Sequence, residues 1–253
     1  MPCCATSFFS QRFGHRCSVH HQGRSGRSAL MMDTAMMSET LVPPSIYYVP
    51  NFITELEESA IISRVNSVPK PKWTQLMNRR LQNWGGIPHP KGMIAEEIPP
   101  WLQNYLNRIN NLQLMNGKVP NHVLVNEYTP GQGIMPHVDG DLFYPTITTI
   151  TCGSHTVLNF RENVDTDSTD ETRVPSTFSL LVERRSLLVV QKVMYENFLH
   201  SIDDVCTDSV SSEIANLDFC SRVYVPGEVI ERQTRISLTI RHVPKTSKIK
   251  IKI

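Results

Sequence analysis

The spacing of hydrophobic residues along the chain changes from helical to strand-like at about residue 121. Before that point, residues 53–69 and 98–115 each predict a helix. The first begins at Thr54, which can cap the helix together with Glu57 three residues later. Between the two helices, residues 73–93 show little periodicity and contain a Gly-Gly pair, so we expect a structured loop there.

After residue 121, short segments rich in β-branched residues are separated by turns or polar loops. The predicted strands are 122–128, 146–153, 155–160, 177–183, 185–191 and 234–243. Another strand is predicted at 45–52, before the first helix. This order predicts a mainly β fold with flanking helices, a sandwich or jelly roll with N-terminal helical support. Two polar inserts, 161–176 and 203–233, are expected to be solvated loops.

The two ends of the chain differ in composition from its middle. Residues 1–45 contain arginines and serines but no acidic residue before Asp33, so they predict a disordered or targeting-like extension. The alternatives are mitochondrial targeting or an upstream start codon, with a methionine at 31–37 as the true beginning. Residues 46–244 form the predicted folded domain, and 245–253 form a basic tail.

Composition does not by itself indicate a nucleic-acid or membrane partner. The 253 residues carry a formal net charge of +1, which does not favour nucleic acid or a membrane surface as partner. No apolar run reaches the roughly 20 residues needed to span a bilayer. The six cysteines show no CxxC spacing, which indicates a reducing compartment. We therefore expect a monomer in the cytoplasm and nucleus, with no membrane contact.

A candidate metal site lies in the stretch "NEYTPGQGIMPHVDGD". His137 and Asp139 are two residues apart, so in a strand both would face the same side. His200 follows at the end of the hydrophobic segment "YENFLHSI". Two histidines and one carboxylate suit non-haem Fe(II), although zinc would accept the same ligands.

The last predicted strand, "TRISLTIRHV", has one apolar and one polar face. Ile236, Leu238 and Ile240 alternate with a polar set made up of Arg235, Ser237, Thr239 and Arg241. If the polar face lines an interior, each arginine needs an anionic partner, because a buried unpaired guanidinium is costly. A dicarboxylate beside the metal would satisfy Arg235 with two hydrogen bonds. The alternative is an exposed face with two solvated arginines.

These features together resemble the AlkB family of Fe(II)- and 2-oxoglutarate-dependent dioxygenases. The resemblance rests on "NEYTPGQGIMPHVD", the distant His200 and "RISLTIR", in the order in which the family has them. An animal branch of the family also shares "IYYVP", "PKPKWTQL", "LQNWGG" and "RSLLVV". The resemblance covers residues from about 45 to 244 and implies a double-stranded β-helix.

The resemblance also implies roles for individual residues. It implies Fe(II) held by His137, Asp139 and His200, with 2-oxoglutarate and O2 as co-substrates. Asn126 and Tyr128 would donate hydrogen bonds to 2-oxoglutarate. The residues on the polar face would have these roles: Arg235 pairs with the distal carboxylate, Arg241 lies near the metal-bound end or orders the substrate side, and Ser237 and Thr239 add hydroxyl contacts.

The substrate is less well defined by the sequence. In the family, the segment before the barrel covers a target nucleotide, and residues 78–92 occupy that place. Trp84 would stack on a flipped base or serve as a packing residue, while Arg79, Arg80 and Lys91 would lie near phosphates. Asp141 is at a position where a bacterial family member has an acid near the base edge.

We therefore expect oxidative demethylation of an alkylated nucleobase in RNA or DNA. The alternative is the same chemistry on a protein or a small molecule. A catalytically silent binding module is a third reading, which the complete ligand set and the arginine pair disfavour. A zinc hydrolase is disfavoured because no general base lies beside the three ligands in the sequence.

Overall fold

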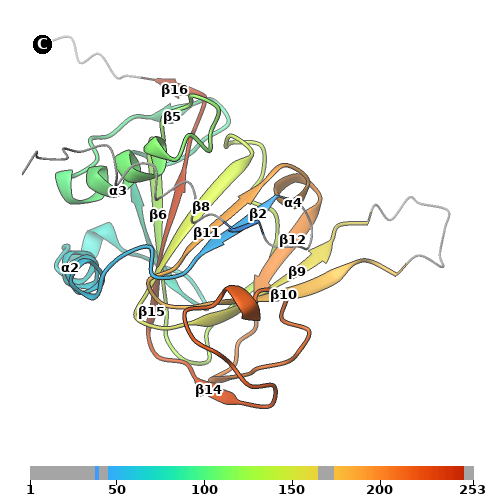
Figure 1. Ribbon diagram of the computed structural model, residues 1–253. Helices are drawn as coiled ribbons and strands as arrows, with labels where there is room; N and C mark the ends of the chain where they lie inside the picture. Colours follow the sequence, from blue (N-terminus) through green and yellow to red (C-terminus); the bar gives the residue numbers. More distant parts are fainter. Residues whose placement is uncertain (1–37, 40–44, 165–173, 248–253) are drawn as a thin grey trace, which may run out of the picture.

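The computed structural model describes residues 38–39, 45–164 and 174–247. Two sheets face each other, and two helices lie against the outer face of the larger sheet (Figure 1). Most of the predicted extension at 1–45, residues 165–173 of the acidic insert 161–176, and most of the basic tail lie outside the described residues. No helix in the described part of the chain is long and apolar enough to cross a membrane.

The larger sheet has the strand order β1-β2-β11-β8-β15-β6-β4-β3. Its strands are β1 (Ser38–Glu39), β2 (Ile46–Val49), β3 (Thr74–Gln75), β4 (Arg80–Trp84), β6 (His122–Tyr128), β8 (Thr146–Cys152), β11 (Leu187–Gln191) and β15 (Arg235–Arg241). All of its neighbouring strands are antiparallel.

The smaller sheet has the order β10-β9-β12-β7. Its strands are β7 (Ile134–His137), β9 (Thr156–Glu162), β10 (Thr177–Val182) and β12 (Phe198–Ile202). From β6 to β15 the chain passes back and forth between the two sheets, which is the jelly-roll arrangement. The prediction of a mainly β fold, a double-stranded β-helix with N-terminal helical support, is confirmed.

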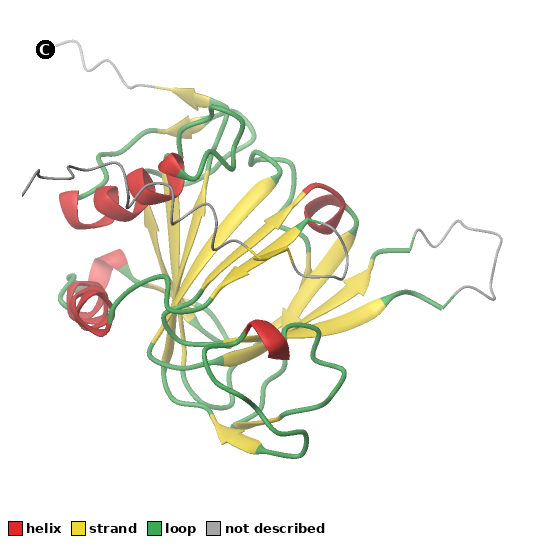
Figure 2. Cartoon of the chain, viewed as in Figure 1, coloured by secondary structure: helices red, strands yellow, loops and turns green. Residues whose placement is uncertain are grey.

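The helices α2 (Glu55–Asn66) and α3 (Pro100–Asn111) cover the outer face of the larger sheet, as Figure 2 shows in red against yellow. Thr54 caps α2, and the side chain of Glu57 returns a hydrogen bond to the backbone of Thr54, as predicted. Ile236, Leu238 and Ile240 pack under these helices, so the apolar face of β15 points toward them. A short helix, α4 (Lys192–Glu196), connects β11 to β12.

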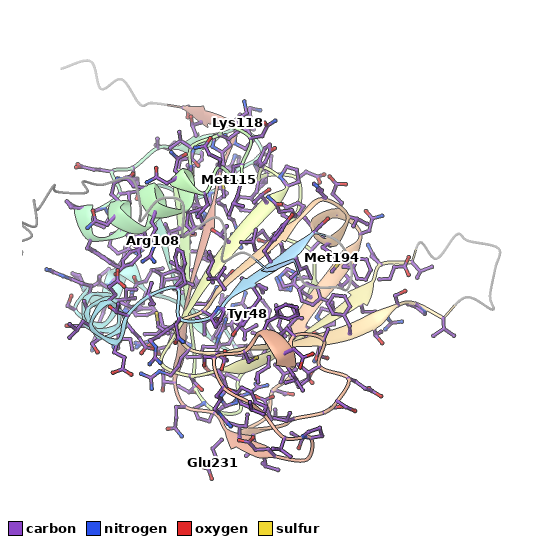
Figure 3. All side chains as sticks on the ribbon, viewed as in Figure 1. Tyr48, Arg108, Met115, Lys118, Met194 and Glu231 are labelled. Carbon is purple, nitrogen blue, oxygen red and sulfur yellow. The ribbon has the colours of Figure 1, made fainter. Side chains whose placement is uncertain are left out.

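A second hydrophobic cluster fills part of the space between the two sheets. It includes Tyr48 and Ile46 from β2, Phe160 from β9 and Leu188 from β11. Figure 3 shows Tyr48 in the middle of the molecule with side chains packed around it. The side chains also leave a cavity beside this cluster, lined in part by Phe160 and Leu188.

The structure differs from the sequence-based expectation in residues 73–93. These residues form the hairpin β3–β4 and the strand β5 (Met93–Ile94), not a loop. Strand β4 pairs along its whole length with β6, so its conformation is stabilised by a partner about 45 residues away in the chain. Gly85, directly after β4, has a positive φ of 87°, and its Cα lies so close to the backbone of Asn121 that no side chain would fit.

The second difference is in residues 203–233, where solvated loops were expected. This insert contains β13 (Thr207–Ser209), β14 (Val229–Glu231) and two buried apolar residues, Val210 and Ile214, that pack against Leu181. Asp208 and Arg232 form a buried ion pair in it. The polar residues of this insert therefore bind one another and the sheet. The remaining elements are η1 (Lys70–Lys72), η2 (Leu217–Phe219) and β16 (Thr246–Ser247), which pairs with β5.

Candidate active site

His137 and His200 lie directly opposite each other on the paired strands β7 and β12. Opposite residues of antiparallel strands have closely spaced side chains, and the two imidazole centroids are 4.3 Å apart. The Nε2 atoms of His137 and His200 lie 3.8 Å and 3.7 Å from the Oδ1 of Asp139. One ligand atom from each residue therefore points to a common centre.

Asp139 is not on the same strand as His137. Strand β7 ends at His137, and Asp139 lies two residues beyond it, so the expectation that both share one strand face is wrong in its detail. The turn continues through Gly140, whose φ of 85° favours glycine. The two side chains nevertheless converge, because the turn bends the carboxylate back toward the imidazoles.

The donor atoms of the three residues fit a divalent metal. The Nδ1 of His137 lies 2.8 Å from the carbonyl oxygen of Met135, so this nitrogen is the donor and the Nε2 lone pair is free. Burial lowers the pKa of His200 to about 4, so its imidazole is neutral at pH 7. The Nη2 of Arg241 lies 2.6 Å from the Oδ2 of Asp139, which leaves Oδ1 for the metal. Two neutral imidazoles and one carboxylate oxygen are a ligand set of Fe(II) and also of zinc.

The cavity beside this centre is lined by all nine residues predicted to bind metal or co-substrate. The set is Asn126, Tyr128, His137, Asp139, His200, Arg235, Ser237, Thr239 and Arg241. The polar face of β15 is therefore an interior surface, and the alternative of two solvated arginines is wrong.

Arg235 is a buried cation of this cavity, and it has no carboxylate partner in the part of the chain that the structure describes. Its Nη2 donates to the Oγ1 of Thr151 over 3.0 Å, while its Nε is buried with no hydrogen-bond partner among the described residues. Burial lowers the pKa of Arg235 to about 10. A buried guanidinium in this state fits an anionic ligand such as the carboxylate of 2-oxoglutarate.

The neighbouring strand β6 presents Asn126 and Tyr128 to the same cavity. The register places Tyr128 opposite Arg235 and Asn126 opposite Ser237, so the polar positions of the two strands share one face. Burial raises the pKa of the Tyr128 hydroxyl, so this group remains a hydrogen-bond donor at neutral pH.

The sequence did not predict the residues that surround this polar set, namely a hydrogen-bond partner of Arg235 and the apolar wall of the cavity. Thr151 accepts a hydrogen bond from Arg235. The sequence could have indicated this position, because Thr151 lies between Ile150 and Cys152, which face the core under the helices, and must therefore face the other way. The apolar wall of the cavity comes from residues on both sheets, namely Leu124, Ile134, Ile147, Leu158, Phe160, Val182, Leu188, Val190 and Ile202. No local pattern distinguishes these residues from the rest of the core, because their common position depends on how the two sheets face each other.

The proposed base-stacking residue Trp84 does not reach the cavity. It lies on the face of β4 that packs under the helices, with its ring centroid 6.2 Å from that of Trp101. Its Nε1 donates to Gln82 over 3.0 Å. Trp84 is therefore a packing residue, the alternative that the sequence had left open.

Three other predicted substrate contacts also lie away from the cavity. Arg80 forms two hydrogen bonds with Glu127, at 2.6 Å and 2.8 Å, on the helix side of the sheet. Lys91 and Asp141 are exposed, and neither lines the cavity. Arg79 is different, since it lines the cavity and donates to Asn126. Arg79 directly precedes β4, and it points to the face of the sheet opposite to that of Arg80, the first residue of the strand.

Comparison with known proteins agrees with this geometry. The family model described as the 2OG-Fe(II) oxygenase superfamily matches residues 61–241. The chain belongs to this superfamily. Within it, the oxygenase is 53% identical over 208 residues to the protein named "Probable RNA/DNA demethylase ALKBH6" of Danio rerio, covering 80% of this chain and 87% of that one. The resemblance to the AlkB family and to its animal branch, which the name ALKBH6 identifies as AlkB homologue six, is confirmed.

Two further similarities are more distant. The oxygenase is 26% identical to "Uncharacterized protein L905" of Acanthamoeba polyphaga mimivirus, covering 77% of this chain and 83% of that one. Among solved structures, it resembles a prolyl hydroxylase from Trichoplax adhaerens in complex with a hypoxia inducible factor peptide fragment. The TM-score is 0.50 at 11% identity, covering 87% of this chain and 94% of that one, which shows a common fold. The protein is thus a 2-oxoglutarate-dependent oxidoreductase with a jelly-roll fold.

Proposed function

We propose that this oxygenase uses Fe(II), 2-oxoglutarate and O2 to remove alkyl groups oxidatively from a nucleobase in RNA or DNA. The observation that carries the chemistry is the cavity that joins a His-Asp-His centre to a buried arginine without a carboxylate partner. The first feature suits a metal, and the second suits a dicarboxylate that reaches the metal at its other end.

Each residue then has a defined task. His137, Asp139 and His200 hold the iron, while Arg241 orients Asp139 so that one oxygen faces the metal. Arg235 binds the distal carboxylate of 2-oxoglutarate, supported by Thr151. Asn126 and Tyr128 donate hydrogen bonds to the co-substrate, and Ser237 and Thr239 add hydroxyl groups to the same wall.

Bound iron with 2-oxoglutarate and O2 supplies the oxidation of a C–H bond to C–OH, with succinate and carbon dioxide as the other products. When the carbon is an N-methyl group, the hydroxymethyl product releases formaldehyde. The chain's own contribution is to hold ligands and co-substrate in position, and its apolar wall excludes water from the reacting atoms.

The nucleic-acid substrate is supported by the name of the Danio rerio relative and by a half-buried arginine, Arg79, on the cavity wall. The alternative is the same chemistry on a protein or small molecule. It is favoured by the net charge of +1 and by the positions of Arg80, Lys91 and Trp84, which do not line the cavity. A basic path for phosphates is therefore not evident around the entrance.

The test is succinate formation from 2-oxoglutarate with Fe(II) and O2, comparing the wild type with His200→Ala. We expect slow turnover in the wild type and none in the variant, because the metal loses a ligand. The matched control is His89→Ala, which removes an exposed histidine away from the cavity and should retain turnover. Equal turnover in wild type and His200→Ala would contradict the metal assignment.

Substrate class is tested by formaldehyde release from N-methylated RNA and DNA oligonucleotides and from methylated peptides. Release from the oligonucleotides alone supports the proposal, and release from peptides alone supports the alternative. Binding of Mn(II) and 2-oxoglutarate without any turnover would indicate a silent binding module.

A further inference from the structure

The side chain of Asn126 is held by Arg79, which lies between strands β3 and β4 at the edge of the larger sheet. The Nε of Arg79 donates to the Oδ1 of Asn126 over 3.1 Å, and both side chains line the cavity. The contact joins residues 47 positions apart in the chain. The Nδ2 of Asn126 has no hydrogen-bond partner in the described part of the protein.

This contact determines which end of the amide faces the cavity. A carboxamide has an accepting oxygen at one end and a donating nitrogen at the other, whereas a guanidinium only donates. Arg79 therefore selects the orientation in which Oδ1 faces Arg79 and Nδ2 remains free to donate. A carboxylate or carbonyl oxygen of 2-oxoglutarate requires that donor, and the flipped amide would oppose it with an oxygen.

The backbone around Arg79 holds this side chain in place. The carbonyl oxygen of Arg79 accepts from the backbone N of Leu76 over 2.9 Å, which closes the turn between β3 and β4. It also accepts from the Nε2 of Gln75 over 3.2 Å. Arg79 directly precedes β4, whose Leu81 pairs with Asn126 in the sheet. The pairing of β4 with β6 thus keeps the β3–β4 hairpin, and Arg79 with it, beside Asn126.

The charges of the cavity are consistent with this role. Of its three arginines, Arg241 is paired with Asp139, while Arg79 and Arg235 have no carboxylate partner among the described residues. A dicarboxylate brings two negative charges to a wall that carries two uncompensated positive ones. Arg79 is thus free of any competing carboxylate among the described residues, and its Nε hydrogen bond goes to Asn126.

We infer that Arg79 is a positioning residue for 2-oxoglutarate, acting by fixing the amide of Asn126 with its Nδ2 toward the co-substrate. This inference rests on the proposed use of 2-oxoglutarate by the cavity. It gives the β3–β4 hairpin a part in co-substrate binding, although the hairpin lies at the edge of the larger sheet.

The test measures the Kd of 2-oxoglutarate by titration calorimetry on the full chain loaded with Mn(II). Arg79→Met keeps an unbranched apolar side chain that reaches about as far as Nε and removes the donors. We expect the Kd to rise about tenfold, the effect of one hydrogen bond that orders a donor to a charged ligand. The matched control is Arg80→Met, the same substitution on the adjacent residue, which faces the helices and pairs with Glu127. It should lower thermal stability and leave the Kd unchanged.

A double-mutant cycle with Asn126→Ala tests whether Arg79 acts through Asn126. If it does, Arg79→Met changes the Kd less than about twofold once Asn126 is alanine. Additive effects would mean that Arg79 contacts the ligand itself, and this would overturn the inference. An unchanged Kd in Arg79→Met, or an equal rise in Arg80→Met, would also overturn it. If the wild type itself binds no 2-oxoglutarate, the proposed function fails and the inference with it.

Discussion

His122 is a buried histidine opposite Arg241, one of the arginines that line the cavity, and its environment keeps it neutral. Its Nε2 lies 3.3 Å from the Oδ1 of Asn83, and its Nδ1 is buried with no hydrogen-bond partner in the described residues. Burial, helped by the charge of Arg241, lowers its pKa from 6.5 to about 3. A second positive charge beside Arg241 is thereby avoided, so the pairing of Arg241 with Asp139 is undisturbed.

This shift predicts a loss of stability in acid. The unfolded chain takes up a proton on this imidazole below about pH 6.5, whereas the folded protein leaves it neutral down to a pKa of about 3. The unfolded state therefore binds more protons, and the free energy of unfolding falls as the pH falls through this window. Between pH 7 and 5 we expect metal-free wild type to lose about 2 kcal/mol more than His122→Gln, measured by urea denaturation. Equal losses in the two proteins would show that His122 titrates normally.

At the scale of elements, a buried carboxylate joins the insert 203–233 to the jelly roll. Glu183 follows β10 and accepts hydrogen bonds from the hydroxyls of Tyr48, Ser221 and Tyr224, at 2.9 Å, 2.7 Å and 3.0 Å. The backbone N of Ser221 donates to it as well, at 2.8 Å. Four donors from two parts of the chain satisfy one charge, so the insert is held to the sheet by polar contacts together with the small cluster around Ile214.

Tyr224→Phe should loosen the insert without affecting the cavity. It removes one hydrogen bond to a carboxylate, which contributes about 2 kcal/mol. We expect amide hydrogen exchange across β13 and β14 to become roughly 30-fold faster, because the insert opens more often. The control is Tyr47→Phe, since the hydroxyl of Tyr47 makes no hydrogen bond in the described part of the chain. Unchanged exchange in Tyr224→Phe would show that apolar packing alone holds the insert.

At the scale of the whole molecule, the candidate site is built from both sheets. His137 and His200 belong to the smaller sheet, whereas Arg235 and Asn126 belong to the larger one. In the proposed function, a metal held by the two histidines would join β7 to β12, and 2-oxoglutarate bound by Arg235 would join the larger sheet to this centre. Ligands that bind only the folded protein stabilise it, so both should raise the melting temperature.

The two ligands are expected to stabilise the protein separately. At a concentration of about 100 times its Kd, each contributes about 2.7 kcal/mol, which corresponds to a rise of about 5–10 °C in a chain of this size. In Arg235→Gln, differential scanning fluorimetry should show the rise with Mn(II) but little further rise with 2-oxoglutarate. A full 2-oxoglutarate shift in this variant would contradict the role of Arg235, and loss of both shifts would indicate a general folding defect.

Much of the fold and the site follows from the sequence, because alternation and capping are local properties. Period-two spacing identified β6, β8 and β15, and the same spacing assigned Arg235 and Ser237 to one face. The Thr54 cap located the start of α2. The types of residue at 137, 139 and 200 indicated a metal before any geometry was known.

The tertiary structure alone determines those features that depend on contacts between distant segments of the chain. Strand β4 is a strand because β6 lies beside it, and its register turns Trp84 toward the helices while Arg79 reaches Asn126. The pairing of β7 with β12 places His200 opposite His137. The sequence thus determined which side chains share a face within each strand, since side chains alternate along the backbone. Only the packing of the sheets decided which faces meet, because register and burial depend on contacts between segments that local spacing does not encode.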